Sequence, residues 1–387
     1  MTDRAFNFSA GPGTLPEPVL RQAQKDAWDI DGSGVGILEH SHRGKVFDRI
    51  TAETEADCRA IAGIPDDYDV FWMQGGATSQ CYFVPANLLA DDRTADYFQT
   101  GKWAEDSIKE APFYGGCHIC ASSKDAHYAF IPSGDQVSYS ESPAYVHFTS
   151  NNTIMGTEFH AEPVPPAGSF LVCDASSDIY SRPIDVSKYG LIYAGAQKNL
   201  GPAGITLLIG KKDIVRNPVR DLPSMQLFKN HAEKEGRFNT PPTFAVYLMG
   251  QVFKWILAEG GLKAMQEHNE AKAAVIYDFL DSQEFYIPHA RKDGPDGRFG
   301  SRSLMNVTFK CPTPELDKVF IEQADAKGLK EMKGHRSIGG MRASMYNAMP
   351  KAGVEALVAH MKDFAQKHQN DPAVLEAKAR GQAVAGG

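Results

Sequence analysis

Residues 191–205 of the chain read LIYAGAQKNLGPAGI, with Lys198 near the centre. Apolar residues typical of a buried strand lead into small residues and an amide, and the lysine then enters a turn rich in glycine and proline. A lysine at the end of a buried strand is partly desolvated, which lowers its pKa and makes a neutral amine available to condense with an aldehyde. A lysine that extends from the strand end into solvent explains this segment equally well.

Length, composition and charge bound the fold and the function. A chain of 387 residues is too long for one compact core, so we expect two domains. Its 42% hydrophobic and 23% charged residues are typical of a soluble globular protein, and its net charge of -8 disfavours general binding to nucleic acids or anionic membranes. The chain shows neither an apolar run long enough to span a membrane nor a signal peptide, so the cytoplasm is the expected compartment.

The six cysteines are scattered along the chain, which favours reduced thiols over a disulfide framework. Cys117 and Cys120 have the spacing of a redox or zinc pair. Because no second pair or matching histidines accompany them, we expect no metal site and favour their packing in a core.

Strand-like runs alternate with helical patterns, which predicts an α/β fold with a mainly parallel sheet. The expected strands are 69–73, 96–100, 118–122, 144–149, 169–173, 189–194 and 205–210. Binding groups should collect where such strands end. Three of these ends carry polar residues: Asn152 with Thr153, Asp174, and Gln197 with Lys198.

Asp174 follows an apolar run directly, so its charge needs a cationic or proton-donating partner. A carboxylate can keep a pyridine nitrogen protonated while a lysine holds the aldehyde of the same ring. An ion pair between Asp174 and Lys198 is the alternative, and their spacing does not exclude it.

Further candidate binding groups occur in turns and loops. The turn Gly75–Ser79 lies between an expected strand and a helix through Leu89, and its backbone amides suit a phosphate. It matches neither a dinucleotide-binding nor a P-loop motif, and a glycine-rich turn also serves packing alone. Trp103, near the start of the next helix, could stack on a flat ring, although a lone tryptophan more often packs in a core.

Two histidine-arginine pairs stand far apart in a net-acidic chain. His42 and Arg43 lie in an amino-terminal loop, and His335 and Arg336 lie close to Arg342. A guanidinium group matches carboxylate or phosphate, and the repetition of the pair favours an anion-binding pocket over two solvated loops.

The expected domains follow from the order of these segments. Residues 16–258 should form the large domain, residues 1–15 and 259–370 the small one, and residues 371–387 a weakly ordered tail. Asn239, Thr240 and Pro241 should cap a long helix at the end of the large domain. The loop 289–301 is expected to be mobile.

Five segments together resemble the class-V aminotransferases of fold type I: AGAQKNLGPAG, DASSDIYSRPIDVSKYGLIYAG, FNTPPTFAVYLMG, KGHRSIGGMRASMYNAMP and SHRGKVF. The resemblance runs from about Phe6 to His368. It implies a large domain with a mainly parallel seven-stranded sheet between helices and a smaller α/β domain. It also implies the cofactor pyridoxal 5'-phosphate and a homodimer with shared active sites.

The activity implied by this resemblance is reversible amino transfer from L-glutamate to 3-phosphohydroxypyruvate, giving O-phospho-L-serine and 2-oxoglutarate. Such an enzyme serves serine biosynthesis, and pyridoxine biosynthesis through 4-phosphohydroxy-L-threonine is a second setting. The alternatives are another fold-type I transaminase, such as an alanine:glyoxylate type, and a non-catalytic protein that binds pyridoxal phosphate. The two histidine-arginine pairs favour a doubly anionic substrate, and no appended interaction domain supports the non-catalytic alternative.

The resemblance also implies roles for the cofactor site. Lys198 would be the Schiff-base lysine and proton carrier, Asp174 would pair with the pyridinium nitrogen, and Trp103 would stack on the ring. Thr153 would bind the ring oxygen. The cofactor phosphate would be held by Ala77, Thr78 and Gln197, together with Asn239 and Thr240 of the other subunit.

For the substrate, the resemblance places Arg342 on the α-carboxylate and the two histidine-arginine pairs on the distal anion, with Ser9 of the amino-terminal motif also at the substrate. The chain departs from the pattern at two positions. Thr78 stands where many bacterial members have an arginine, which removes one expected cation from the phosphate pocket. Ser9 is followed by Ala10 where some members have a second serine.

Overall fold

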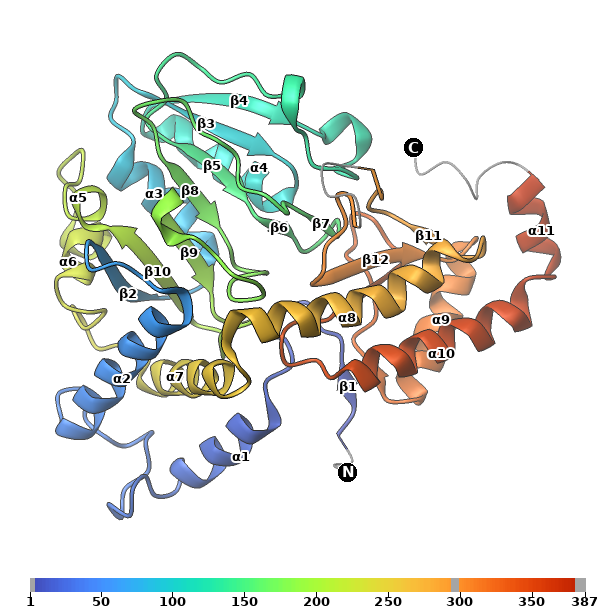
Figure 1. The fold of residues 1–387 in the computed structure, drawn as a ribbon, viewed down its shortest axis with the longest axis horizontal. Coiled ribbons are helices and arrows are strands. Elements are labelled where there is room, and N and C mark those ends of the chain that lie inside the picture. The colour runs from blue at the N-terminus through green and yellow to red at the C-terminus, as the bar shows by residue number, and fades with distance from the viewer. Residues whose placement is uncertain (1–3, 294–298, 380–387) are drawn as a thin grey trace.

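The computed structural model describes residues 4–293 and 299–379, which form two lobes (Figure 1). The larger lobe surrounds a seven-stranded sheet, and the smaller lobe contains a three-stranded sheet. The long helix α8 extends from α7 of the larger lobe along the smaller one. The α-helices of the described residues are α1 (Glu17–Asp26), α2 (Lys45–Ala62), α3 (Gln80–Leu88), α4 (Lys102–Glu110), α5 (Lys212–Val215), α6 (Phe228–Ala232), α7 (Thr243–Ala258), α8 (Gly261–Asp281), α9 (Pro314–Ala326), α10 (Lys351–His368) and α11 (Pro372–Ala379).

The large sheet has the strand order β2-β10-β9-β8-β5-β3-β4. Strand β10 runs antiparallel to both of its neighbours, and the pairs from β9 through β4 are parallel, which confirms the predicted α/β fold with a mainly parallel seven-stranded sheet. The strands are β2 (Tyr68–Gln74), β3 (Thr94–Gln99), β4 (Gly116–Ser122), β5 (Val146–Thr149), β8 (Leu171–Asp174), β9 (Tyr189–Gly195) and β10 (Ile205–Lys211).

The central strand β9 is buried along its whole length because helices cover both faces of the sheet. Successive side chains of a strand point to opposite faces. Ile192 and Ala194 therefore join a core that includes α2 and α7, whereas Leu191 and Tyr193 join a core that includes α3. An apolar run buried on both faces thus ends directly before the turn that carries Lys198.

The smaller lobe is built on an antiparallel sheet of β11 (Ile287–Pro288), β12 (Asn306–Lys310) and β14 (Met341–Ser344). Its core packs side chains of this sheet against α8, α9 and α10. The amino-terminal strand β1 (Phe6–Asn7) pairs with β13 (Leu329–Lys330) in this lobe. A short hairpin of β6 (Asn151–Asn152) and β7 (Thr157–Glu158) extends from the end of β5. The proposed domain boundaries at residues 15 and 258 stay predictions.

Two sequence-based expectations are wrong in this structure. Helix α7 begins at Thr243 without a side-chain cap, because the amide of Asn239 donates instead to Gln74 Oε1 at 2.6 Å. Part of the expected tail is ordered as α11, because Val374 is buried against the smaller core. Residues 380–387 and five residues of the loop 289–301 lie outside the described residues. Among the helices described, none has the length and apolar character needed to cross a bilayer.

Candidate active site

A cavity lies at the carboxyl ends of the parallel strands, as their topology predicts. It is lined from three sides: by the turn after β2, by the end of β8 and by the turn after β9. The cavity brings together six of the residues predicted from the sequence, Ala77, Thr78, Trp103, Asp174, Gln197 and Lys198. It also contains Gly76 of the predicted turn, and residues that the sequence analysis did not single out as binding groups, Cys81, Thr149, Asn151, Ser176 and Ser177.

The amine of Lys198 is buried at the wall of this cavity, and its side chain is held by a hydrogen bond from Nζ to Thr153 Oγ1 at 2.6 Å. Burial lowers the pKa of Lys198 to about 8, a shift that the charge of Asp174 opposes and that of Arg342 reinforces. A useful fraction of the amine is therefore neutral near pH 7, which the alternative of a solvent-exposed lysine would not provide.

Asp174 is the last residue of β8, and its carboxylate is buried at the bottom of the cavity. Its Oδ1 atom accepts hydrogen bonds from the backbone N–H of Ser176 at 3.0 Å and from the Ser176 hydroxyl at 2.6 Å. Burial raises the pKa of Asp174, while the Ser176 bonds and the charge of Lys198 oppose that shift. The carboxylate is thus held in a fixed orientation and would gain from a positively charged partner.

Three polar atoms that face this cavity are buried and have no hydrogen-bond partner among residues 4–293 and 299–379: Trp103 Nε1, Thr149 Oγ1 and Gln197 Oε1. Buried polar atoms are normally hydrogen-bonded. Three such atoms around one cavity indicate that it receives a ligand with polar groups of its own.

The turn between β2 and α3 is suited to an anion. Gly75 has φ of +97°, a conformation that favours glycine, and a Cβ atom on Gly76 would meet nothing within 4 Å. The short 3-10 turn Ala77–Ser79 then leads into α3, and no side chain caps either amino terminus. Open backbone N–H groups at a helix amino terminus form a site for phosphate.

The amino-terminal segment lies over the Lys198 turn. The backbone N–H of Gly13 donates to the carbonyl of Gln197 at 2.7 Å, and a Cβ atom on Gly11 would lie 3.5 Å from Lys198 Cγ. The predicted residue Ser9 belongs to this segment, where its hydroxyl accepts from the N–H of Gly11. This segment, which lies more than 180 residues before Lys198 in sequence, therefore forms part of the wall beside the lysine.

The predicted cations of the smaller lobe collect near the same site. Arg342 lies on β14, and its charge acts on Lys198. Burial and the positive charges of Arg342, Arg336 and Lys102 lower the pKa of His335. The sequence analysis missed Lys102, which is the first residue of α4 and adjoins Trp103. Its position beside a candidate ring-stacking residue was the available signal.

Nine of the fifteen predicted site residues do not line the Lys198 cavity. Five of them are described above, and the other four are His42, Arg43, Asn239 and Thr240. His42 and Arg43 line a separate cavity together with charged residues that include Asp48 and Arg237. Asn239 is half-buried beside Gln74, and Thr240 is exposed next to it. A single chain therefore does not bring all the predicted phosphate-binding and anion-binding residues together.

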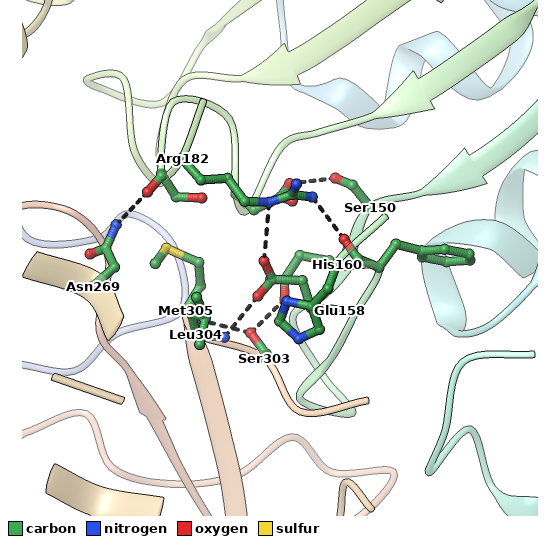
Figure 2. Close-up of polar contacts among 12 residues, drawn as sticks. Ser150, Glu158, His160, Arg182, Asn269, Ser303, Leu304 and Met305 are labelled. Atoms are coloured by element: carbon green, nitrogen blue, oxygen red, sulfur yellow. Dashed lines mark hydrogen bonds and ion pairs between the residues drawn. The ribbon is translucent and has the colours of Figure 1, made fainter. Parts of the chain in front are cut away.

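A buried polar junction joins the two lobes (Figure 2). Glu158 Oε2 accepts from the backbone N–H of Leu304 at 2.7 Å, and Glu158 Oε1 lies 3.7 Å from Arg182 Nε. Ser150 donates to the carboxylate of Asp178 and, at 3.2 Å, to the backbone carbonyl of Asp174. The sequence analysis missed this junction because its members are polar residues in irregular segments and share no spacing.

A comparison with protein-family models identifies a match over residues 5–357 to the family described as Aminotransferase class-V. Two curated relatives, the phosphoserine aminotransferases of Desulfotalea psychrophila and Lysinibacillus sphaericus, are each 47% identical to this chain. These alignments cover 96% and 95% of this chain and the full length of both relatives.

Solved structures are similar over the same extent. The phosphoserine aminotransferase of Bacillus circulans subsp. alkalophilus superposes with a TM-score of 0.90 at 41% identity, over 95% of this chain and 100% of that one. A pyridoxal-phosphate-bound phosphoserine aminotransferase of Trichomonas vaginalis superposes with a TM-score of 0.87 at 34% identity, over 93% of this chain and 100% of that one.

Proposed function

This chain belongs to the class-V aminotransferases, and from that membership we propose that it is a phosphoserine aminotransferase. It transfers an amino group reversibly from L-glutamate to 3-phosphohydroxypyruvate, with pyridoxal 5'-phosphate as cofactor. The observation that carries this function is a buried lysine of lowered pKa opposite a buried carboxylate, in a cavity bordered by the cations of the smaller lobe.

The residues of the cavity fit this cofactor. Asp174 would hold the ring nitrogen, Trp103 would stack on the ring, and Thr153 would bind the ring oxygen. The amides of Ala77 and Thr78, with Gln197, would hold the phosphate. When bound, the cofactor supplies an electron-accepting ring that stabilises negative charge at the α-carbon of the substrate.

Lys198 would provide the covalent link to the cofactor. Once the amino group of the substrate replaced it in that link, its free Nζ atom, held beside Thr153 Oγ1, would accept a proton from the substrate α-carbon and return one on the way to product. A pKa of about 8 is close to neutral pH, and a pKa near the ambient pH is the condition for efficient proton transfer in both directions.

The cations of the smaller lobe would select the substrate. Arg342 would form a two-point contact with the α-carboxylate, and His335 with Arg336 would bind the distal carboxylate or phosphate. A substrate with two anionic ends uses both contacts. Glyoxylate has only one such end, which disfavours the alanine:glyoxylate alternative.

We expect the purified holoenzyme to convert 3-phosphohydroxypyruvate and L-glutamate to O-phospho-L-serine and 2-oxoglutarate. Its kcat/KM for this acceptor should exceed that for glyoxylate or pyruvate by about 10²-fold or more, because two charge-assisted hydrogen bonds of about 1.5 kcal/mol each are lost with the uncharged end. Product formation followed by mass spectrometry measures both. Equal use of glyoxylate would contradict the assignment, and absence of any transamination would favour a non-catalytic protein.

We further propose a homodimer in which His42, Arg43, Asn239 and Thr240 serve the active site of the other subunit. Two features support it. These residues lie away from the Lys198 cavity of their own chain. The segment between α1 and α2, which contains His42, also exposes Trp28 and Leu38 at 86% and 60% of their surfaces, and large exposed apolar side chains are typical of an interface.

Subunit complementation tests this arrangement. Arg43→Ala and Lys198→Ala are each expected to be strongly impaired. If the variants are mixed, unfolded and refolded together, half of the dimers are hybrids, and one of the two sites in each hybrid is intact. The mixture should regain about a quarter of the wild-type activity. No gain over the separate variants would place Arg43 in the site of its own subunit.

The same site chemistry supports two finer proposals. A phosphorylated hydroxythreonine has the same two anionic ends, so we propose 4-phosphohydroxy-L-threonine, an intermediate of pyridoxine biosynthesis, as a second amino product beside serine biosynthesis. We propose the cytoplasm as the compartment, in keeping with the free thiols of all six cysteines.

A further inference from the structure

Lys272 is a buried lysine for which the proposed mechanism has no use. It lies on α8 with no solvent exposure, and its Nζ atom donates to the backbone carbonyls of Met345 at 2.9 Å and Tyr346 at 2.7 Å. In the part of the chain that the structure describes, burial alone shifts its pKa, and no carboxylate charge opposes that shift. Burial of an amine costs free energy, and a methionine at this position would avoid that cost. The presence of a lysine with two hydrogen bonds at this buried position therefore requires an explanation.

The chemistry of the contact suits a neutral amine. Burial lowers the pKa of Lys272 well below its usual range. A neutral amine has two N–H groups, which equals the number of carbonyl acceptors that Lys272 contacts. Through these two hydrogen bonds the side chain satisfies both carbonyls and anchors the backbone.

The anchored turn, Met345–Asn347, connects the turn that carries Lys198 (the lysine turn) to helix α8. The backbone N–H of Asn347 donates to Oδ1 of Asn199, the neighbour of Lys198, at 3.0 Å. Asn347 Oδ1 accepts from Asn269 Nδ2 at 2.8 Å. Asn269 lies one turn before Lys272 on α8 and also donates to the carbonyl of Ser181 at 3.0 Å (Figure 2).

The same turn also holds the other walls of the site. The hydroxyl of Tyr346 donates to the carbonyl of Ala10 at 2.6 Å, and its ring packs against Gly13, where a Cβ atom would lie only 2.6 Å from Cδ2. On its amino-terminal side the turn continues directly from β14, which carries Arg342. Three parts of the active site, the lysine turn, the amino-terminal segment and the arginine strand, thus meet at one three-residue turn.

We propose that Lys272 is a positioning residue that anchors the Met345–Asn347 turn and thereby holds Arg342 at the distance from Lys198 that binds the substrate α-carboxylate. This inference rests on the proposed role of Arg342. Its consequence is specific: loss of the anchor should weaken substrate binding, because a displacement of about 1 Å in a binding group costs up to about 10²-fold.

The test replaces Lys272 with methionine, which preserves length and removes both N–H donors. We expect KM for L-glutamate and for 3-phosphohydroxypyruvate to rise about tenfold or more, with kcat changed less than about threefold. Lys263→Met is the matched control, because Lys263 is an exposed lysine on the same helix. The control should match the wild-type enzyme in both constants.

Titration calorimetry of the holoenzyme with 2-oxoglutarate gives a second readout that does not depend on turnover. The Lys272→Met protein should bind it about tenfold more weakly, even if the wild-type enzyme proves to prefer another amino acceptor. A lower melting temperature with unchanged KM and unchanged affinity would show a merely structural role and overturn the proposal. A fall in kcat at unchanged KM would overturn it as well.

If Lys272→Met does not fold, Asn269→Leu decides the question by the same criteria. This substitution releases Asn347 from α8 and leaves the two carbonyl bonds of Lys272 in place. Raised KM with little change in kcat would support the positioning role of the turn. Unchanged KM and affinity would refute it.

Discussion

Replacement of Lys198 with alanine is expected to lower the rate of transamination by about 10⁴-fold or more, because in the proposed mechanism one atom, Nζ, serves first as the covalent attachment point and then as the proton carrier. The fold should persist, since within the described residues the side chain forms one hydrogen bond, to Thr153, and the surrounding turn is held by its backbone. Steady-state assays with both substrates, circular dichroism and thermal denaturation measure these effects.

Lys188→Ala is the matched control for that variant. Lys188 lies just before β9, on the approach to the same turn, and pairs with Glu162 at the surface. Because exposed ion pairs contribute little, this variant should retain activity within about twofold of wild type. Substantial transamination by Lys198→Ala, with the control unchanged, would contradict the assigned role of Lys198.

Replacement of Asp174 with asparagine is expected to lower kcat by about 10²-fold at pH 7. Asparagine has nearly the same shape and can still accept from Ser176, but it removes the negative charge that would keep the ring nitrogen protonated. A charge-assisted hydrogen bond contributes about 1.5 to 3 kcal/mol, which corresponds to about 10- to 150-fold in rate. Stopped-flow measurement of each half-reaction would locate the loss in the chemical step.

The same variant should be more stable than the wild-type protein when the cofactor is removed. Burial raises the pKa of Asp174 in the folded state, so its contribution favours folding only at low pH and is lost as the pH rises through the folded pKa. At pH 7 the wild-type apoprotein bears the free-energy cost of a buried, ionised Asp174, whereas the variant has no charge at this position. The difference in melting temperature between the variant and wild-type apoproteins should decrease as the pH falls toward 4. A variant that is equally active, or less stable at pH 7, would contradict the proposed environment of Asp174.

Much of the fold and of the cofactor site was predictable from local sequence. Asp174, Gln197 and Lys198 each follow an apolar run that is buried in the structure, and parallel strands bring their carboxyl ends to one edge. The glycine-rich turn at Gly75 and Gly76 was equally visible, because its conformation requires particular residues. Such features depend on residues that are neighbours in sequence, so they can be recognised in the amino-acid sequence alone.

The expectations that failed concern contacts between distant segments. The predicted cap on α7 is absent because Asn239 bonds to Gln74, 165 residues away. Part of the expected tail forms α11 because Val374 packs in the core of the smaller lobe. Propensity and pattern describe a segment in isolation, and tertiary contacts override them at the ends of elements.

The sequence by itself determined the α/β fold, because strand periodicity and turn chemistry are local properties of the chain. Its motifs also indicated the family and six of the residues that line the Lys198 cavity. Only the tertiary structure decided which cations share a site with Lys198, that His42 and Arg43 lie apart from it, and that Lys272 anchors the turn beside Asn199. The reason is physical. The charge on a group, the loss of its water and the identity of its hydrogen-bond partners depend on atoms brought close by folding, whatever their separation along the chain.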